Sequence, residues 1–162
     1  MTHSRYARAL GVLAAVFVTT AGLAASTGRF ATLEERLIGA DAVVVATARS
    51  VTSEWRENRF GDRLIVSRVE LEVDEALKGS PSRTMWLELE GGTLDGFTLS
   101  VSSLPSIRGG ERAVFFLDQP SRGVSTLHLR GQGVLFLDDD DVVRGSSLRL
   151  NDIRVQARSL GK

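Results

Sequence analysis

Residues 68–77 read RVELEVDEAL, and this stretch decides the fold class of the chain. Val69, Leu71 and Val73 alternate with charged neighbours, and Leu77 closes the stretch. A period of two is the pattern of a β-strand whose two faces differ, because successive side chains point to opposite sides of a sheet. One face of this strand is therefore expected in a core and the other in water.

Further strands are predicted on both sides of this stretch. Residues 42–48 read AVVVATA, which is apolar on both faces and typical of a central strand. The other predicted strands cover residues 85–90, 97–101, 113–117, 126–129, 134–137 and 142–143. About seven short strands with short turns between them indicate an all-β fold, either a sandwich or a closed Greek-key barrel.

Gly91 and Gly92 favour the barrel over the sandwich. They follow the predicted strand at 85–90, and apolar alternation resumes at 97–101. Closed sheets need bend points where a strand turns a corner, and glycine is typical of such points.

Short helices are predicted at both ends of the β domain. Thr32-Leu33-Glu34-Glu35 has the spacing of a capping box, and Gly39 follows at the predicted end of the first helix. In that helix, Leu33, Leu37 and Ile38 fall on one side. Residues 147–162 are interpreted as a C-terminal short helix or tail, with Leu150, Ile153, Ala157 and Leu160 at roughly helical spacing.

The first 25 residues have the three parts of a secretory signal: a basic start, an apolar run over residues 9–20, and small residues after it. Cleavage after Ala24 is one possibility, and Ala25 or Ser26 are other cut sites. An uncleaved membrane anchor is the competing interpretation. Cleavage leaves a β domain over residues 26–146 and the C-terminal tail, so we expect a secreted or periplasmic protein.

Charge and residue content exclude several classes of function. Removal of residues 1–25 takes away two arginines and no acid, so the charge becomes 18 minus 20, or −2. A nearly neutral domain has no electrostatic reason to bind nucleic acid or an anionic membrane. The chain has no cysteine, which excludes disulfides, thiolate metal sites and cysteine nucleophiles.

No catalytic, metal or cofactor site is expected, so the chain is predicted not to be an enzyme. His128 is the only histidine after residue 25, and it is expected at an edge or facing solvent. No nucleophile elbow or phosphate-binding loop is present. Asp138–Asp141 is interpreted as a turn, with a calcium site as the alternative. A solvated surface is predicted for Glu70, Glu72, Glu88 and Glu90.

A loop rich in aromatic and arginine residues is the first candidate binding site. Trp55, Arg56 and Phe60 lie in a polar stretch that also contains Arg59. Tryptophan and arginine are enriched at the energetic centres of protein interfaces. Two interpretations stay open: Trp55 is exposed on the loop, or it folds back over an open end of the barrel.

Several segments together resemble netrin-like domains, including the inhibitory domain of tissue inhibitors of metalloproteinases. The resemblance is carried by residues 41–48, Phe60-Gly61-Asp62, Leu77-Lys78-Gly79, residues 96–101 and residues 109–117. It covers residues 30–137 and extends to bacterial secreted proteins of unassigned role. The resemblance implies a Greek-key barrel of the oligonucleotide/oligosaccharide-binding (OB) type.

The resemblance also implies a way of binding a partner. In those inhibitors, a cysteine at the mature amino terminus chelates the protease zinc through its α-amine and carbonyl. This chain has no cysteine, and its predicted helix at 32–38 differs from the family's extended start. A cut after Ala24 gives Ala25 a free amine, and any α-amine can ligate zinc.

We therefore expect an exported, non-enzymatic binding module, inhibitor-like towards metalloproteases or associated with a protease. The expected partner is a protein, for example a secreted zinc protease. The alternative is an OB-type domain of the cell envelope that binds an oligosaccharide or a peptide. The predicted partner-binding residues are Ala25, Ser26, Trp55, Arg56, Phe60, Gly91, Gly92 and Phe97.

Overall fold

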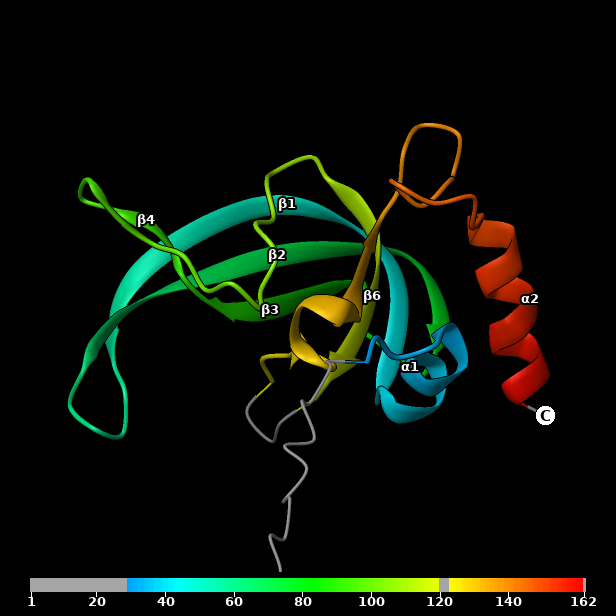
Figure 1. The fold of residues 1–162 in the computed structure, drawn as a ribbon, viewed down its shortest axis with the longest axis horizontal. Helices are drawn as coiled ribbons and strands as arrows, with labels where there is room; N and C mark the ends of the chain where they lie inside the picture. Colours follow the sequence, from blue (N-terminus) through cyan, green and yellow to red (C-terminus); the bar gives the residue numbers. More distant parts are fainter. Residues whose placement is uncertain (1–28, 120–122, 162) are drawn as a thin grey trace, which may run out of the picture.

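The computed structural model describes residues 29–119 and 123–161 (Figure 1). Its elements are α1 (Leu33–Gly39), β1 (Ala42–Glu57), β2 (Arg63–Lys78), β3 (Thr84–Glu90), β4 (Gly92–Leu94), β5 (Phe97–Leu99), β6 (Arg112–Asp118), β7 (Thr126–Leu127), the 3-10 helix η1 (Arg130–Gly133), β8 (Val134–Phe136) and α2 (Leu150–Leu160). The prediction of an all-β fold with a short helix near each end is confirmed. The predicted signal over residues 1–25 lies outside the described residues.

Antiparallel ladders join the longer strands into one sheet in the order β3-β2-β1-β6-β7, with β8 also paired to β6. These ladders are an open path, so the predicted closed barrel is not found as a continuous set of ladders. The two ends of the path meet at one isolated parallel bridge between Leu87 of β3 and Ser125. There the Glu88 amide donates to the Ser125 carbonyl at 2.9 Å, and the Ser125 amide donates to the Trp86 carbonyl at 2.8 Å.

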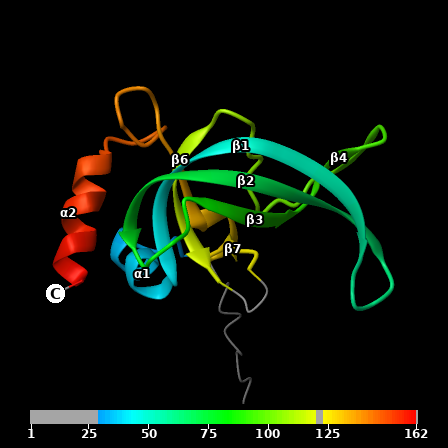
Figure 2. The same ribbon diagram turned by 180° about the vertical axis from the view of Figure 1, so that it is seen from behind.

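β1 is the central strand, as its two apolar faces predict. Its side chains alternate between two core clusters that lie on opposite sides of the sheet. Val44 and Ala46 belong to the cluster that also contains Val69, Leu71, Leu87 and Phe115. Val43 and Val45 belong to the cluster that also contains Leu37, Phe116, Leu150 and Ile153. The helices α1 and α2 therefore cover one face at one end of the sheet, away from the turn between β1 and β2 (Figure 2).

The first helix begins as its sequence predicts, and each of the two helices leaves one apolar residue of its predicted face in water. The capping box of α1 is present, with the Thr32 hydroxyl accepting from the Glu35 amide and the Glu35 carboxylate accepting from the Thr32 amide. Leu37 is buried, whereas Ile38 is 59% exposed. Leu160 is likewise exposed at the end of α2. Each helix is too short to bury more than a narrow stripe, so its flanking apolar residue faces solvent.

Gly91 and Gly92 end β3 rather than bend it into a longer strand. Their backbone φ values are +105° and +136°, which side chains rarely permit. The chain then leaves the main sheet and forms the β4–β5 hairpin, which is a separate two-stranded sheet. The prediction that residues 97–101 form a strand of the core sheet is therefore wrong. Phe97 is 64% exposed and does not belong to the core.

Candidate functional site

The ends of β1 and β2 extend beyond the rest of the sheet and form a two-stranded arm, residues 55–65 (Figure 1). Its tip is a turn built by Asn58, whose side-chain oxygen accepts from the amides of Phe60 at 2.8 Å and Asp62 at 3.0 Å. Phe60 is 74% exposed at this tip, and the Arg59 guanidinium lies 4.7 Å from the centre of its ring. The turn thus holds an aromatic side chain in water at the end of the molecule.

Trp55 lies within β1, so the prediction that it belongs to a loop is wrong. Its ring meets Phe97 of β5 edge-on, with ring centres 6.0 Å apart, and its indole N–H donates to Asp95 at 3.2 Å. The Arg63 guanidinium lies 4.9 Å from the centre of the indole ring. Trp55 therefore neither hangs free nor closes a barrel end. It joins the arm to the β4–β5 hairpin.

Arg56 lies next to Trp55 in β1 but serves the opposite face of the strand, because side chains alternate. Its guanidinium pairs with Glu88 of β3 and with Glu54. Hydrogen bonds to Glu88 and then to Glu54 raise the pKa of Arg56 above its usual range. The structure thus separates Arg56 from the aromatic pair and ties it to the sheet.

Gly92 allows a close approach between the hairpin and the sheet. A β-carbon at this position would lie 2.3 Å from the Ser67 hydroxyl oxygen and 2.8 Å from that of Ser53. The Ser67 hydroxyl donates to the Gly91 carbonyl at 2.7 Å, and the two serine oxygens are 3.3 Å apart. The glycine pair therefore positions the hairpin over the inner face of β1 and β2.

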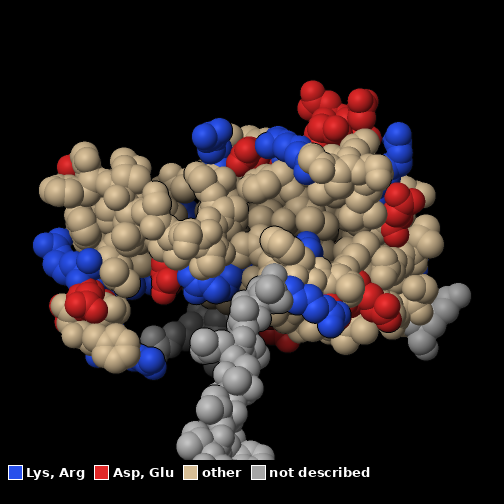
Figure 3. Space-filling view, in the orientation of Figure 1, with Lys and Arg blue, Asp and Glu red and all other residues tan. Residues whose placement is uncertain are grey.

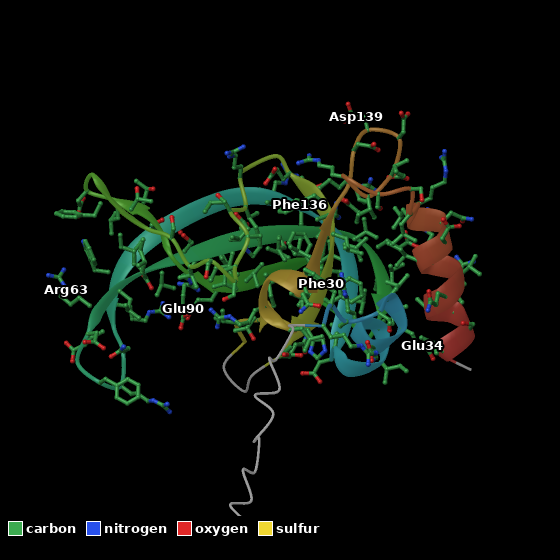
Figure 4. All side chains as sticks on the ribbon, in the orientation of Figure 1. Phe30, Glu34, Arg63, Glu90, Phe136 and Asp139 are labelled. Carbon is green, nitrogen blue, oxygen red and sulfur yellow. The ribbon has the colours of Figure 1, made fainter. Side chains whose placement is uncertain are left out.

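A cleft of about 400 Å³ lies between the sheet and the segment that follows β4. Its floor includes Val51, Ser53, Ser67 and Val69, and its far side is formed by residues 98–101 and 104–107. Glu90 is the one charged residue that lines it among the described residues. Figure 4 shows Glu90 at the end of β3 and Arg63 further out on the arm. The cleft therefore offers aliphatic groups and hydroxyls to a ligand.

Of the eight predicted partner-binding residues, the structure brings Trp55 and Phe97 into contact with each other, and Gly91 and Gly92 line the cleft. Phe60 lies at the tip of the same arm, and Arg56 faces away. Ala25 and Ser26 lie outside the described residues. Sequence reasoning missed Arg63, Asp95 and the serine pair. Ser53 and Ser67 lie opposite each other on β1 and β2, and their pairing could be recognised only with the register of that hairpin known.

The predicted surface acids form ion pairs and hydrogen bonds. Glu72 pairs with Arg49 and Arg83, Glu88 with Arg56, and Glu90 with Arg130, while Glu70 accepts from the Ser50 hydroxyl at 3.1 Å. The four aspartates at 138–141 form a turn in which the Asp138 carboxylate accepts from the amides of Asp140 and Val142. Asp138, Asp139 and Asp140 are exposed, and an acidic patch is visible at this end of the molecule in Figure 3. Across residues 29–119 and 123–161, no three potential metal ligands of the His, Cys, Asp or Glu type come together.

His128 is more enclosed than predicted. Its side chain is 16% exposed, and its Nδ1 lies 2.8 Å from the Asp118 carboxylate. The ring rests against Gly39 at the end of α1, where a β-carbon would come within 2.4 Å of Nε2. His128 therefore has a packing role between the sheet and α1.

No helix within the described part of the chain is long and apolar enough to cross a bilayer. No family model matches the chain, and no curated protein matches it in sequence.

Proposed function

We propose that the chain is an exported, non-enzymatic binding module that holds a protein partner with its arm and the β4–β5 hairpin. The observation that carries this proposal is the contact among Trp55, Phe97 and Arg63, which ties the two hairpins together. Exposed aromatic groups on tethered hairpins lose little conformational freedom on binding, because they are ordered beforehand. Export is supported by the signal-like composition of residues 1–25.

We propose the OB-type, netrin-like barrel as the scaffold. Support comes from the strand order β3-β2-β1-β6-β7 together with the parallel bridge at Leu87 and Ser125, which brings the two ends of that path together. In OB folds, a five-stranded and partly open Greek-key barrel carries loops that bind ligands. A rigid sheet that presents hairpins at one end suits the same use here.

The two exposed phenylalanines supply the energy for this interaction. Complete burial of a phenylalanine side chain contributes about 1.5–3 kcal/mol, and Phe60 and Phe97 are both mostly in water in the isolated chain. Arg59 and Arg63 stand beside aromatic rings on the same arm. Aromatic and arginine side chains are the types that dominate binding energy at protein interfaces.

The partner class to test first is a secreted zinc protease, on the strength of the resemblance to netrin-like inhibitors. The purified chain, in large molar excess, is expected to reduce the activity of at least one enzyme in a panel of secreted zinc proteases on a zymogram. Undiminished activity of every enzyme in the panel would refute a zinc protease as the partner. The proposal of a binding module for another protein would stand.

A small-ligand function is the second candidate, and the cleft lined by Val51, Ser53 and Ser67 favours it. An OB-type domain of the cell envelope would take a peptide or an oligosaccharide there. Titration with a glycan panel and with peptides, followed by Trp55 fluorescence in a Trp86→Phe background, separates the two ligand classes. Quenching by glycans alone would favour the oligosaccharide.

Two double variants test the leading proposal. Phe60→Ala/Phe97→Ala, the arm variant, removes the exposed rings of the arm and of the β4–β5 hairpin. Ile38→Ala/Val155→Ala removes two comparably exposed apolar side chains from the helices. Each variant is immobilised and exposed to the extracytoplasmic proteins of the cells that make the chain. The arm variant is expected to retain about tenfold less partner protein, or even less, than the unaltered chain retains. For the helix variant, the amount retained is expected to fall by less than about twofold. Equal retention by both variants would refute the arm as the binding surface.

A further inference from the structure

One edge of β1 is free over the second half of the strand. β1 pairs with β2 as far as Glu57, but it pairs with β6 only from Ala42 to Thr47. Beyond that point the Gly110 amide donates to the Ala48 carbonyl at 2.7 Å, and within the described residues no ladder follows on this side. Residues 50–57 therefore present one unpaired strand edge.

The register identifies which backbone groups point to that edge. Residues opposite each other in an antiparallel pair exchange either both hydrogen bonds or neither, in alternation. The Ile65 carbonyl accepts from the Gly91 amide at 2.8 Å, so Ile65 directs its backbone groups away from β1. Trp55 is opposite Ile65, and the register runs unbroken from Glu57 back to Ser50. Trp55, Ser53 and Val51 therefore direct their amides and carbonyls to the free edge.

The same three residues direct their side chains to the inner face, where the cleft lies. Val51 and Ser53 line the cleft, and Trp55 contacts the β4–β5 hairpin. In a sheet, residues directly opposite each other have their side chains on the same face. A strand added to this edge would thus send the side chains opposite Val51 and Ser53 towards the cleft.

The lining of the cleft indicates the chemistry of those side chains. Besides Glu90, its lining side chains are aliphatic or carry hydroxyls, among them Ser53, Ser67 and Thr98. Glu90 is already paired with Arg130 at 3.5 Å. A charged group would lose its hydration there without a partner, whereas a hydroxyl can donate to or accept from an uncharged polar group.

We propose that the free edge of β1 binds an extended, uncharged segment of a partner protein as an added strand, with alternate small apolar or hydroxyl side chains in the cleft. The proposal rests on the proposed function, because the segment belongs to the protein that the arm holds. Main-chain hydrogen bonds to Val51, Ser53 and Trp55 supply affinity, and the cleft supplies selectivity.

A second copy of the chain fits this edge less well. Antiparallel pairing of two such edges about Ser53 would set Trp55 of the copy opposite Val51. Trp55 carries the β4–β5 hairpin through its contacts with Phe97 and Asp95. The second copy would therefore bring its own β4–β5 hairpin against the cleft. A single extended segment carries no such hairpin.

The first test uses peptides as probes. A seven-residue peptide that alternates valine with serine, acetylated and amidated at its ends, is titrated into the ¹⁵N-labelled chain and followed by NMR. We expect saturable shifts confined to residues 50–56 and the cleft, and slower hydrogen exchange at the amides of Val51, Ser53 and Trp55. Glutamate in place of valine, or N-methylation of alternate amides, should weaken binding by about tenfold or more. No saturable shift, or equal binding by all three peptides, would overturn the proposal.

The second test separates this proposal from the proposed function. Val51→Glu puts a charge in the cleft, and Thr52→Glu puts the same charge on the opposite face, beside Arg68. Val51→Glu is expected to abolish binding of the valine–serine peptide and of the captured partner, whereas Thr52→Glu is expected to preserve both. The urea unfolding midpoints of the two variants are expected to match. If the arm variant loses the partner but Val51→Glu keeps it, strand addition fails and the proposed function stands. Concentration-dependent dimers that Val51→Glu abolishes would show that the edge serves a second copy, and would also overturn strand addition by a partner.

Discussion

Gly92 shows how a single residue sets the geometry of the candidate site. Its φ of +136° and the 2.3 Å approach of the Ser67 hydroxyl oxygen leave no room for a side chain. Other glycines of the arm and hairpin are different. Gly96, for example, has a φ of +80° at the tip of the hairpin, with no atom within 4 Å of an added β-carbon.

Gly92→Ala is therefore expected to destabilise the chain by about 2–4 kcal/mol, because it adds a clash to the cost of a strained backbone. Gly96→Ala carries the backbone cost alone, about 1–2 kcal/mol. Urea unfolding of the two variants measures the difference. Equal losses would mean that the contact between Gly92 and the serine pair is not tight.

Glu35 makes the stability of α1 depend on pH. Hydrogen bonds with the Thr32 backbone and then the Thr32 side chain lower the pKa of Glu35 below its usual 4.5. A lowered pKa in the folded chain contributes stability above the unfolded value, and this stability is lost as the pH falls through the folded value.

Between about pH 5 and about pH 3, the unaltered chain should therefore lose more stability than Glu35→Gln, which has no charge to protonate. Glu34→Gln, in the same helical turn but outside the capping box, should follow the unaltered chain. Urea midpoints at several pH values decide this. Parallel curves for the unaltered chain and Glu35→Gln would contradict the role of the capping box.

At the scale of elements, a strand could be predicted where one of its faces is apolar. The ends of the strands could not be predicted. Residues 68–77 alternate between core and solvent, so their strand is visible in the sequence. Residues 51–57 continue β1 with mostly partly or fully exposed side chains on both faces, and they resemble a polar loop. They form a strand because β2 pairs with their backbone. Backbone pairing does not require apolar and polar residues to alternate, so the sequence carries no sign of this strand. The arm therefore could not be predicted, although its aromatic residues could be named.

The end of α1 is held by a side chain from another element. Lys78 at the end of β2 donates to the carbonyls of Leu37, Ile38 and Ala40 at 2.9, 2.8 and 2.7 Å. The carbonyls of Leu37 and Ile38 lack partners within a helix that ends at Gly39, and Ala40 is the residue that caps this end. A cation at a helix C-terminus is favourable for the helix dipole as well.

Lys78→Met keeps the aliphatic stem and removes the donors, so it should cost about 1–3 kcal/mol. Arg83→Met removes a cation that is mostly in water and should change stability by less than about 0.5 kcal/mol. Thermal unfolding of both variants provides the comparison. A loss for Lys78→Met as small as that for Arg83→Met would mean that the three hydrogen bonds contribute nothing net.

Trp55 couples two elements, and its removal should loosen one of them. Trp55→Ala deletes the contacts with Phe97 and Asp95, so the amides of the β4–β5 hairpin should exchange faster by an amount equal to about 1 kcal/mol or more. Phe60→Ala removes a ring at the tip of the arm, where it stacks with Arg59, and should leave exchange in the β4–β5 hairpin unchanged. Unchanged exchange in both variants would mean that the hairpin is held by Gly91 and Gly92 alone.

At the scale of the whole molecule, the described chain has a helical end and an arm end. One core cluster lies between the sheet and the two helices, and the other lies on the opposite face of the sheet. The arm and the β4–β5 hairpin extend from the other end with exposed aromatic rings. The sequence predicted an all-β core with a terminal helix at each end. It did not predict the separate hairpin, since a glycine pair can bend a strand or end it, and only tertiary packing decides.

A photo-crosslinking amino acid tests the central claim, that the partner is held at the arm end. The chain carries it at position 60 on the arm or at position 155 on α2, two exposed positions at opposite ends of the molecule. Both forms are irradiated with the protein fraction from which the unaltered chain captures its partner. We predict a discrete covalent adduct from position 60 and none from position 155. An adduct from position 155 alone would contradict the account.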